Sequence, residues 1–247
     1  MARSISFNRL ADRDDALRGG LERGRDAAEV LARHLAPGAR IVEVGVGTGA
    51  VATALADRGL AVAGVDVAEE MLDRAHARLG AMVVRADGAA VPLRTGAVDN
   101  VYLVWVLHLV ADPADVVTEC ARLLRPGGRF VAVAVDPQTD DDIQQAWVGM
   151  ESLRVRIDTP EAVVGWADAA GFTLVGRDHF AWHTDESPAE YAKQIEDRSF
   201  SCLWNVDDAT WASVVQPAID GLRALPEPDR RRHRVARYPV TVFERRG

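Results

Sequence analysis

The chain has 247 residues, of which 48% are hydrophobic and 27% are charged, and its formal net charge is −8. This length suits one α/β domain with additions, and the composition is ordinary for a globular protein. The negative charge argues against a nucleic-acid backbone or an anionic membrane surface as a partner, so neither is expected.

Residues 1–37 are predicted to form two helices, the second from about Leu21 to Leu35, where Pro37-Gly38 ends it. They are expected to be either a solvated cover for a sheet or a lid over a site, with Gly19-Gly20 as its hinge. The N-terminus lacks a signal-peptide core, and the longest apolar stretch, Val101 to Ala111, is too short for a bilayer. A cytoplasmic location is expected.

A glycine-rich turn follows the first predicted strand, Ile41 to Val44, and precedes a helix that ends near Arg58-Gly59. Glycine allows positive φ angles and has no Cβ to keep a ligand away from the backbone. The N–H groups at the start of the following helix point toward whatever lies over the turn. The turn is therefore a candidate nucleotide site, although a tight connection without a ligand also fits. Its glycines are Gly45, Gly47 and Gly49.

Acidic residues stand at three predicted strand ends. Glu43 precedes the glycines, and Asp66 ends the second strand about 20 residues later, where a carboxylate can bind two ribose hydroxyls. After a helix from Ala68 to Leu79, the third strand, Met82 to Ala86, leads into Asp87-Gly88. Asp87 either binds a ligand or caps its own turn.

The stretch from Val98 to Val110 is almost wholly apolar, which is typical of a strand buried on both faces. It contains His108, a candidate general base, although a lone histidine more often has a structural role. A helix from Asp112 to Leu124 follows, and then Leu123-Leu-Arg-Pro-Gly-Gly-Arg-Phe130 leads into a fifth strand.

The second half is predicted to alternate between helices and strands less regularly. Arg230 to Arg234 is interpreted as a solvated loop, and the last strand is expected to be antiparallel. The alternation predicts a doubly wound, mostly parallel seven-stranded sheet with added N- and C-terminal helices. The predicted elements are a helix from Thr159 to Gly171, strands from Phe172 to His183 and from Val240 to Glu244, helices from Pro188 to Asp197 and from Asp207 to Leu222, and helical insertions near 137–157 and 184–234 within a domain spanning 38–247.

From Gly38 to Val135 the chain resembles the class I S-adenosylmethionine-dependent methyltransferases, in the acid before Gly-x-Gly-x-Gly and in the Arg-Pro-Gly-Gly segment. The resemblance implies a Rossmann-like fold and transfer of a methyl group to a small-molecule acceptor. It places Glu43 near the amino group of methionine, Asp66 on the ribose and Asp87 on the adenine amine. The implied cofactor-binding residues are Glu43, Gly45, Gly47, Gly49, Asp66, Val67, Met71, Asp87, Gly88, Leu103 and Val104, with no metal.

Two alternatives stay open. Gly45-x-Gly47-x-x-Ala50 also fits the dinucleotide fingerprint of an NAD(P)-dependent oxidoreductase, against which Asp87 and the Arg-Pro-Gly-Gly segment stand. A catalytically silent member of the fold, acting as a regulatory partner, would carry the same cofactor residues. The acceptor, the atom that is methylated and the oligomeric state do not follow from the sequence.

Overall fold

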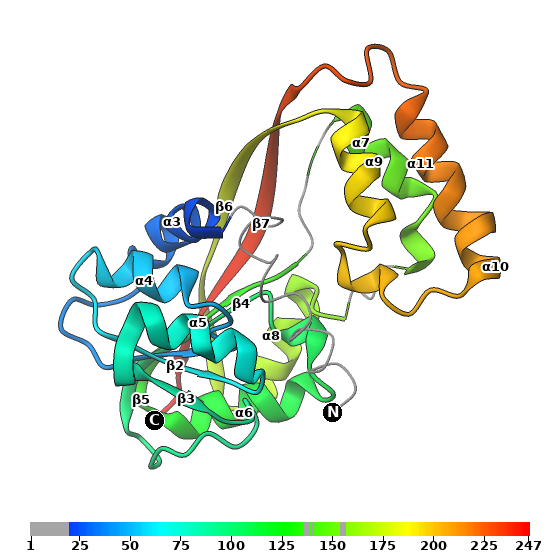
Figure 1. Ribbon diagram of the computed structural model, residues 1–247. Coiled ribbons are helices and arrows are strands. Elements are labelled where there is room, and N and C mark those ends of the chain that lie inside the picture. The colour runs from blue at the N-terminus through cyan, green and yellow to red at the C-terminus, as the bar shows by residue number, and fades with distance from the viewer. Residues whose placement is uncertain (1–19, 136–138, 140, 154–156) are drawn as a thin grey trace. The chain divides into compact units, whose positions relative to one another are not determined.

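The computed structural model describes residues 20–135, 139, 141–153 and 157–247. It contains a seven-stranded sheet with strand order β3-β2-β1-β4-β5-β7-β6, in which β7 runs antiparallel to β5 (Figure 1). The predicted fold class, a mostly parallel sheet whose last strand is antiparallel, is confirmed. The strands are β1 Ile41–Val44, β2 Val62–Asp66, β3 Val83–Arg85, β4 Val98–Val104, β5 Leu124–Val133, β6 Phe172–Glu186 and β7 Arg232–Arg245.

Strand β1 lies at the centre of the parallel part and pairs with both β2 and β4. All four of its residues are buried, because helices cover both faces of the sheet. The strand order reverses between β1 and β4, so the carboxyl ends of these two strands flank the crevice where α/β sheets of this kind bind ligands.

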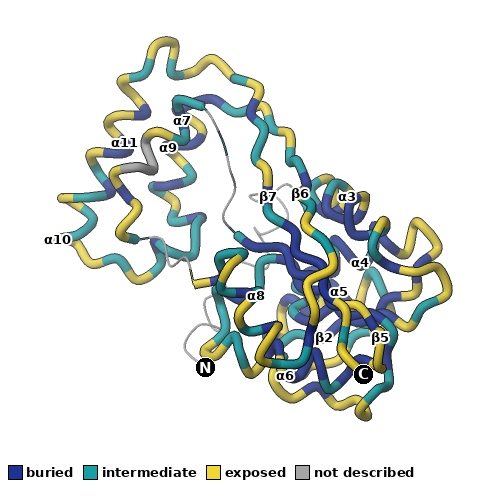
Figure 2. The backbone as a smooth tube through the Cα atoms, turned by 180° about the vertical axis from the view of Figure 1, so that it is seen from behind, coloured by how far each residue is buried: buried dark blue, intermediate teal, exposed yellow. Residues whose placement is uncertain are grey.

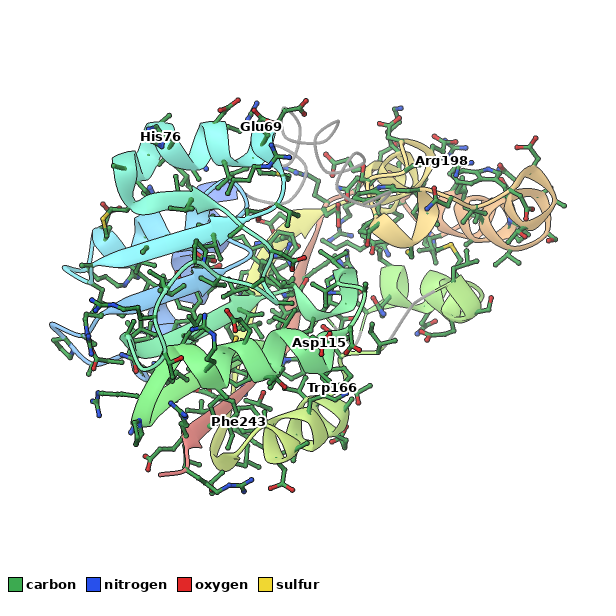
Figure 3. The ribbon with its side chains drawn as sticks, turned by 90° about the horizontal axis from the view of Figure 1, so that it is seen from below. Glu69, His76, Asp115, Trp166, Arg198 and Phe243 are labelled. Carbon is green, nitrogen blue, oxygen red and sulfur yellow. The ribbon has the colours of Figure 1, made fainter. Side chains whose placement is uncertain are left out.

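Helices lie on both faces of the sheet. Figure 3 shows α5, which carries Glu69 and His76, on one face, and α6 and α8, which carry Asp115 and Trp166, on the other. Helix α6 begins at Pro113 because the Asp112 carboxylate accepts hydrogen bonds from the first free N–H groups. The helices are α3 Gly20–Leu31, α4 Ala50–Ala56, α5 Glu69–Leu79, α6 Pro113–Leu123, α7 Asp142–Val148, α8 Pro160–Ala169, α9 Pro188–Glu196, α10 Asp208–Thr210, the π-helix η5 Trp211–Val215 and α11 Gln216–Arg223.

The Arg-Pro-Gly-Gly segment has a structural explanation. The Asp99 carboxylate accepts hydrogen bonds from Arg40 and Arg125, which ties the starts of β1 and β4 to β5. A Cβ on Gly128 would lie 2.9 Å from the carbonyl oxygens of Asp99 and Arg125, so only glycine fits this close approach. The two guanidinium groups hold the pKa of the Asp99 carboxyl well below its usual range.

Two predicted boundaries differ most from the structure. Strand β4 ends at Val104 and not at Val110, because Trp105 takes a φ angle of 55° and turns the chain out of the sheet into a short 3-10 helix, η2 Leu107–Leu109. Strand β7 pairs with β5 over the predicted range, Val240 to Glu244, but it begins earlier, at Arg232. The prediction of a solvated loop up to Arg234 therefore fails.

The described residues divide into two compact units. Unit 1 is the described part of Met1–Asp136 with Ile157–Phe180 and Tyr238–Gly247, and unit 2 is the described part of Pro137–Arg156 with Ala181–Arg237. Unit 1 has its core around the central strands, which are buried in Figure 2. Unit 2 has a separate core in which α7, α9 and α11 pack together. Within the described residues, no helix has the length and hydropathy of a membrane span.

Candidate cofactor and active site

The glycine turn joins β1 to α4, and all three of its glycines have positive φ angles, 79° at Gly45, 52° at Gly47 and 79° at Gly49. The N–H groups of Gly45 and Val46 donate to the carbonyl oxygen of Val65, which fastens the turn to the end of β2. No heavy atom lies within 4 Å of the position that a Cβ on Gly47 would take. The turn thus leaves open space beside its backbone, as a ligand-binding turn must.

Asp66 ends β2 directly beside this turn. Its carboxylate accepts a hydrogen bond from the Gly47 N–H at 2.8 Å and another from the Ala68 N–H at 2.9 Å. Both hydrogen bonds fix the carboxylate without using all of its lone pairs. The structure therefore brings Gly47 and Asp66 together, although they are 19 residues apart.

Glu43 is buried within the sheet, where its carboxyl group accepts a hydrogen bond from the Tyr102 hydroxyl of β4 at 2.8 Å. Burial, with a smaller contribution from the charge of Asp66, raises the pKa of Glu43 to about 8, although the Tyr102 hydrogen bond acts in the opposite direction. The buried position of Glu43 thus favours the protonated form of its carboxyl group.

Asp87 and Gly88 follow β3 at the same edge of the sheet, because Arg85 pairs with Asp66. The Asp87 side chain is exposed and accepts a hydrogen bond from the Ala89 N–H at 2.9 Å, as a turn cap does. A Cβ on Gly88 would lie 2.8 Å from a methyl group of Val44, so this segment touches the end of β1.

Two charged residues of α6, Glu119 and Arg122, hold residues 91–93 in place, and no sequence pattern singled them out. Glu119 accepts a hydrogen bond from the Val91 N–H at 2.8 Å, and Arg122 donates to the carbonyl oxygens of Val91 and Leu93. Arg122 also binds Glu119 at 2.6 Å. This pair fixes the chain just after Asp87, which makes it part of the support of the site.

Of the four remaining predicted cofactor residues, three are buried and one is exposed. Leu103 and Val104 are buried at the end of β4. Met71 is buried against Ala68 in a small cluster, whereas Val67 is exposed. The structure places all four near the carboxyl ends of β2 and β4, and their contact with a cofactor stays a prediction.

Helix α3 lies against the start of α4. A Cβ on Gly24 would lie 2.7 Å from the carbonyl oxygen of Ala50, so the two backbones nearly touch. The Arg23 guanidinium stacks 3.5 Å from the centre of the Trp105 ring, which in turn contacts Tyr238. The predicted hinge residue Gly20 begins α3 with a φ angle of 42°, and the first predicted helix lies outside the described residues.

His108 lies in η2, the short helix after β4, and its Nδ1 is 3.5 Å from Oδ2 of Asp158. Asp158 stands just before α8, about 50 residues away in the chain, and no sequence pattern distinguished it from a loop residue. The structure thus adds a buried carboxylate to the candidate base.

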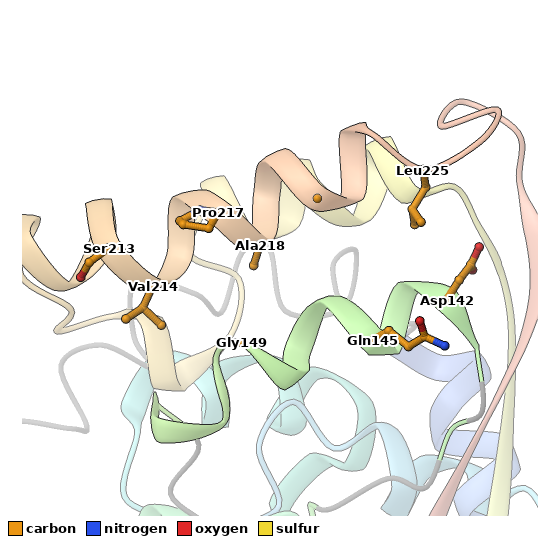
Figure 4. A pocket seen from close by; sticks show the side chains of 9 residues that line it. Asp142, Gln145, Gly149, Ser213, Val214, Pro217, Ala218 and Leu225 are labelled. Carbon is orange, nitrogen blue, oxygen red and sulfur yellow. The ribbon is translucent and has the colours of Figure 1, made fainter.

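A separate pocket of about 360 Å³ lies within unit 2, between α7 and the helices η5 and α11 (Figure 4). Its walls are mainly small and apolar, with Asp142, Gln145 and Ser213 as the charged and polar residues. None of the predicted cofactor residues lines it. In the part of the chain that the structure describes, no cluster of three or more potential metal ligands occurs.

Comparison with known proteins gives two kinds of match. The model of a family described as a methyltransferase domain matches residues 42–132. An uncharacterized methyltransferase of Mycobacterium tuberculosis is 33% identical over 220 residues, which cover 84% of this chain and 82% of that protein. The chain belongs to the class I S-adenosylmethionine-dependent methyltransferases.

Other methyltransferases are similar over a shorter range or in fold alone. A ubiquinone biosynthesis O-methyltransferase of Bordetella bronchiseptica is 37% identical over 97 residues, covering 37% of this chain and 40% of that enzyme. The solved phosphoethanolamine N-methyltransferase 2 of Haemonchus contortus, in complex with phosphomonomethylethanolamine and S-adenosylhomocysteine, has a TM-score of 0.58 at 17% identity. That similarity covers 97% of this chain and 58% of the other.

The residues of this methyltransferase fit the cofactor that its family uses. The space over Gly47 admits a ligand against the backbone, and Asp66 holds acceptor oxygens beside it. Glu43 is a buried acid that a nearby ammonium group would ionise. When bound, S-adenosylmethionine supplies an electrophilic methyl group on a sulfonium.

The state of Glu43 leads to a testable result. If the ammonium group of S-adenosylhomocysteine binds close to Glu43, it favours the carboxylate and lowers the raised pKa, so binding at pH 7 releases a proton. Calorimetry in two buffers with different ionisation enthalpies measures that proton. We expect release from the wild type and none from Glu43→Gln. Equal proton release by both proteins would show that Glu43 does not face the ammonium group.

Proposed function

We propose that this methyltransferase transfers a methyl group from S-adenosylmethionine to a small-molecule acceptor at oxygen, nitrogen or carbon. The observation that carries the proposal is the open space at Gly47 beside the fixed carboxylate of Asp66. Two of the similar methyltransferases support it, because one is an O-methyltransferase of ubiquinone biosynthesis and the other was solved with phosphomonomethylethanolamine and S-adenosylhomocysteine. The absence of an overall positive charge agrees with a small, uncharged or cationic acceptor.

In this proposal the glycine turn contacts the methionine and ribose portions of the cofactor, and Asp66 accepts hydrogen bonds from the ribose hydroxyls. Asp87 and Gly88 lie along the adenine, and the backbone of Leu103 and Val104 lies along the methionine. The proposed location is the cytoplasm, and residues 1–37 act as a lid, of which the structure describes residues 20–37, including α3.

Titration calorimetry with S-adenosylmethionine, S-adenosylhomocysteine and NAD tests the cofactor. We expect micromolar binding of the first two and none of NAD. Binding of NAD alone would instead support an oxidoreductase. Incubation with a labelled methyl donor and a small-molecule extract then separates an active enzyme from a catalytically silent cofactor-binding protein.

Gly47→Ala tests where the cofactor lies. The added methyl group would enter the open space over the turn, so we expect affinity for S-adenosylhomocysteine to fall about tenfold, which corresponds to about 1.4 kcal/mol. Gly59→Ala is the matched control, because Gly59 also has a positive φ angle and open space around it, but follows α4. Both variants lose about 1–2 kcal/mol of stability from backbone strain. Equal affinities of the two variants would contradict the placement of the cofactor.

A further inference from the structure

The segment after β4 connects His108 to the glycine turn. Trp105 turns the chain out of the sheet with its positive φ angle, and the next residue, Val106, packs directly on Gly45. A Cβ on Gly45 would lie only 2.4 Å from a methyl group of Val106. His108 follows two residues later in η2, so its backbone is anchored to the turn that the proposed cofactor contacts.

Asp158 approaches His108 from the other side. It precedes Thr159, whose side chain caps α8, and Pro160 then starts that helix. Its side chain is 2% exposed, and that of His108 is 11% exposed. The cap and the proline fix the backbone next to Asp158, so its carboxylate is held beside the imidazole by the fold.

One oxygen of the Asp158 carboxylate is buried without a hydrogen bond. Among the described residues, its buried Oδ2 atom accepts none, and its ion-pair partner is Nδ1 of His108 at 3.5 Å. A buried carboxylate oxygen without a hydrogen bond destabilises the fold, and an apolar residue of similar size would avoid this cost. A role in holding the imidazole accounts for the carboxylate at this position.

We propose, on the basis of the proposed function, that Asp158 is a positioning residue for His108. It accepts the hydrogen on Nδ1 and thereby fixes the tautomer in which Nε2 carries a lone pair. Nδ1 and Oδ2 are 3.5 Å apart, and a movement of a few tenths of an ångström would bring them within hydrogen-bond distance. The imidazole then serves as a general base whose positive form the carboxylate stabilises.

This arrangement selects the chemistry of the acceptor. The proton of an acceptor O–H or N–H group passes to Nε2 as the acceptor atom bonds to the methyl carbon, and the electron pair of the broken carbon–sulfur bond stays on sulfur. The imidazolium afterwards loses its proton to solvent. The acceptor is therefore a hydroxyl or a protonated or hydrogen-bearing nitrogen, because a tertiary amine needs no base.

The test is a tautomer measurement that requires no acceptor. In protein with ¹⁵N-labelled histidine at neutral pH, the ring nitrogen shifts report which nitrogen carries the hydrogen. Of six histidines, His108 is assigned by the loss of its signals in His108→Gln. We expect His108 in the wild type to hold its hydrogen on Nδ1. Asp158→Leu cannot accept that hydrogen, so we expect this preference to be lost while the melting temperature is kept.

Asp158→Asn is the second variant in case leucine disturbs the fold, and Asp168→Asn, at an exposed position on α8, is the control. An Nδ1 hydrogen that persists in both Asp158 variants, or is absent in the wild type, would overturn the positioning role.

The second measurement is the rate of methyl transfer from a labelled donor to acceptors in a small-molecule extract. We expect Asp158→Leu to lower the turnover roughly ten- to hundredfold, with unchanged calorimetric affinity for S-adenosylhomocysteine. A wild type that fails to bind S-adenosylhomocysteine would refute the proposed function alone. Normal binding and normal turnover in Asp158→Leu would refute only the role of Asp158.

Discussion

Asp66→Asn is expected to weaken the binding of S-adenosylhomocysteine about a hundredfold, which corresponds to about 2.7 kcal/mol. In the native protein the two carboxylate oxygens accept hydrogen bonds from the N–H groups of Gly47 and Ala68. An amide side chain has one acceptor oxygen, so one of these N–H groups would face an NH₂ group. The turn would lose support, and the ribose hydroxyls would lose a charged acceptor, at about 1.5–3 kcal/mol for a charge-assisted hydrogen bond.

Calorimetry of this variant needs a control for the loss of one negative charge. Asp57→Asn provides it, since Asp57 is an exposed residue at the end of α4. We expect Asp57→Asn to bind like the wild type. Native affinity in Asp66→Asn would show that the ribose does not lie against this carboxylate.

Arg234→Met is expected to destabilise unit 2 by about 3–5 kcal/mol, the usual effect of breaking a buried ion pair. Arg234 is 8% exposed, and it binds Asp141 at 3.1 Å and Glu186 at 2.7 Å. Its guanidinium also lies 4.7 Å from the centre of the Tyr191 ring. Methionine would replace the apolar volume of the side chain but would leave two carboxylates without their cation.

The stability that unit 2 loses in Arg234→Met should depend on pH. Burial already raises the pKa of Glu186, while Arg234 lowers it, so removing the cation raises that pKa further. A raised carboxyl pKa contributes stability that is present below the unfolded pKa and is lost as the pH rises through the folded pKa. Arg234→Met should therefore be less destabilised at pH 5 than at pH 8, and adding Glu186→Gln should restore part of the stability.

Because unit 2 has its own core, its opening is best followed locally, by hydrogen exchange of the amides in α9 and α11. Arg230→Met is the control, since Arg230 and Glu227 form a solvent-exposed pair with 70% and 68% exposed side chains. An exposed pair contributes about 0–1 kcal/mol. Equal exchange rates in the Arg234 and Arg230 variants would show that the buried network does not stabilise unit 2.

The mostly parallel sheet, the glycine turn and the place of Asp66 at a strand end could be predicted because their signals are local. A strand, a turn with glycines at positive φ angles, a helix and a second strand fit within about 26 residues, and short crossovers between parallel strands leave few topologies. The segment from Val98 to Val110 shows the limit of such signals. Its apolar composition predicted one strand, but the backbone leaves the sheet at Trp105. The Trp105 ring instead contacts Arg23 and Tyr238.

The sequence by itself determined that this protein has a mostly parallel α/β sheet, a glycine-rich turn after the first strand and acids at neighbouring strand ends, because hydrophobic period and glycine position act over a few residues. Only the tertiary structure decided which distant charges meet. Asp158 and His108, like Arg234 and Glu186, are about 50 residues apart, and no sequence pattern links the two members of either pair. The free energy of a charged group depends far more on whether the group is buried than on which residues adjoin it in the sequence. Burial is a property of the folded chain.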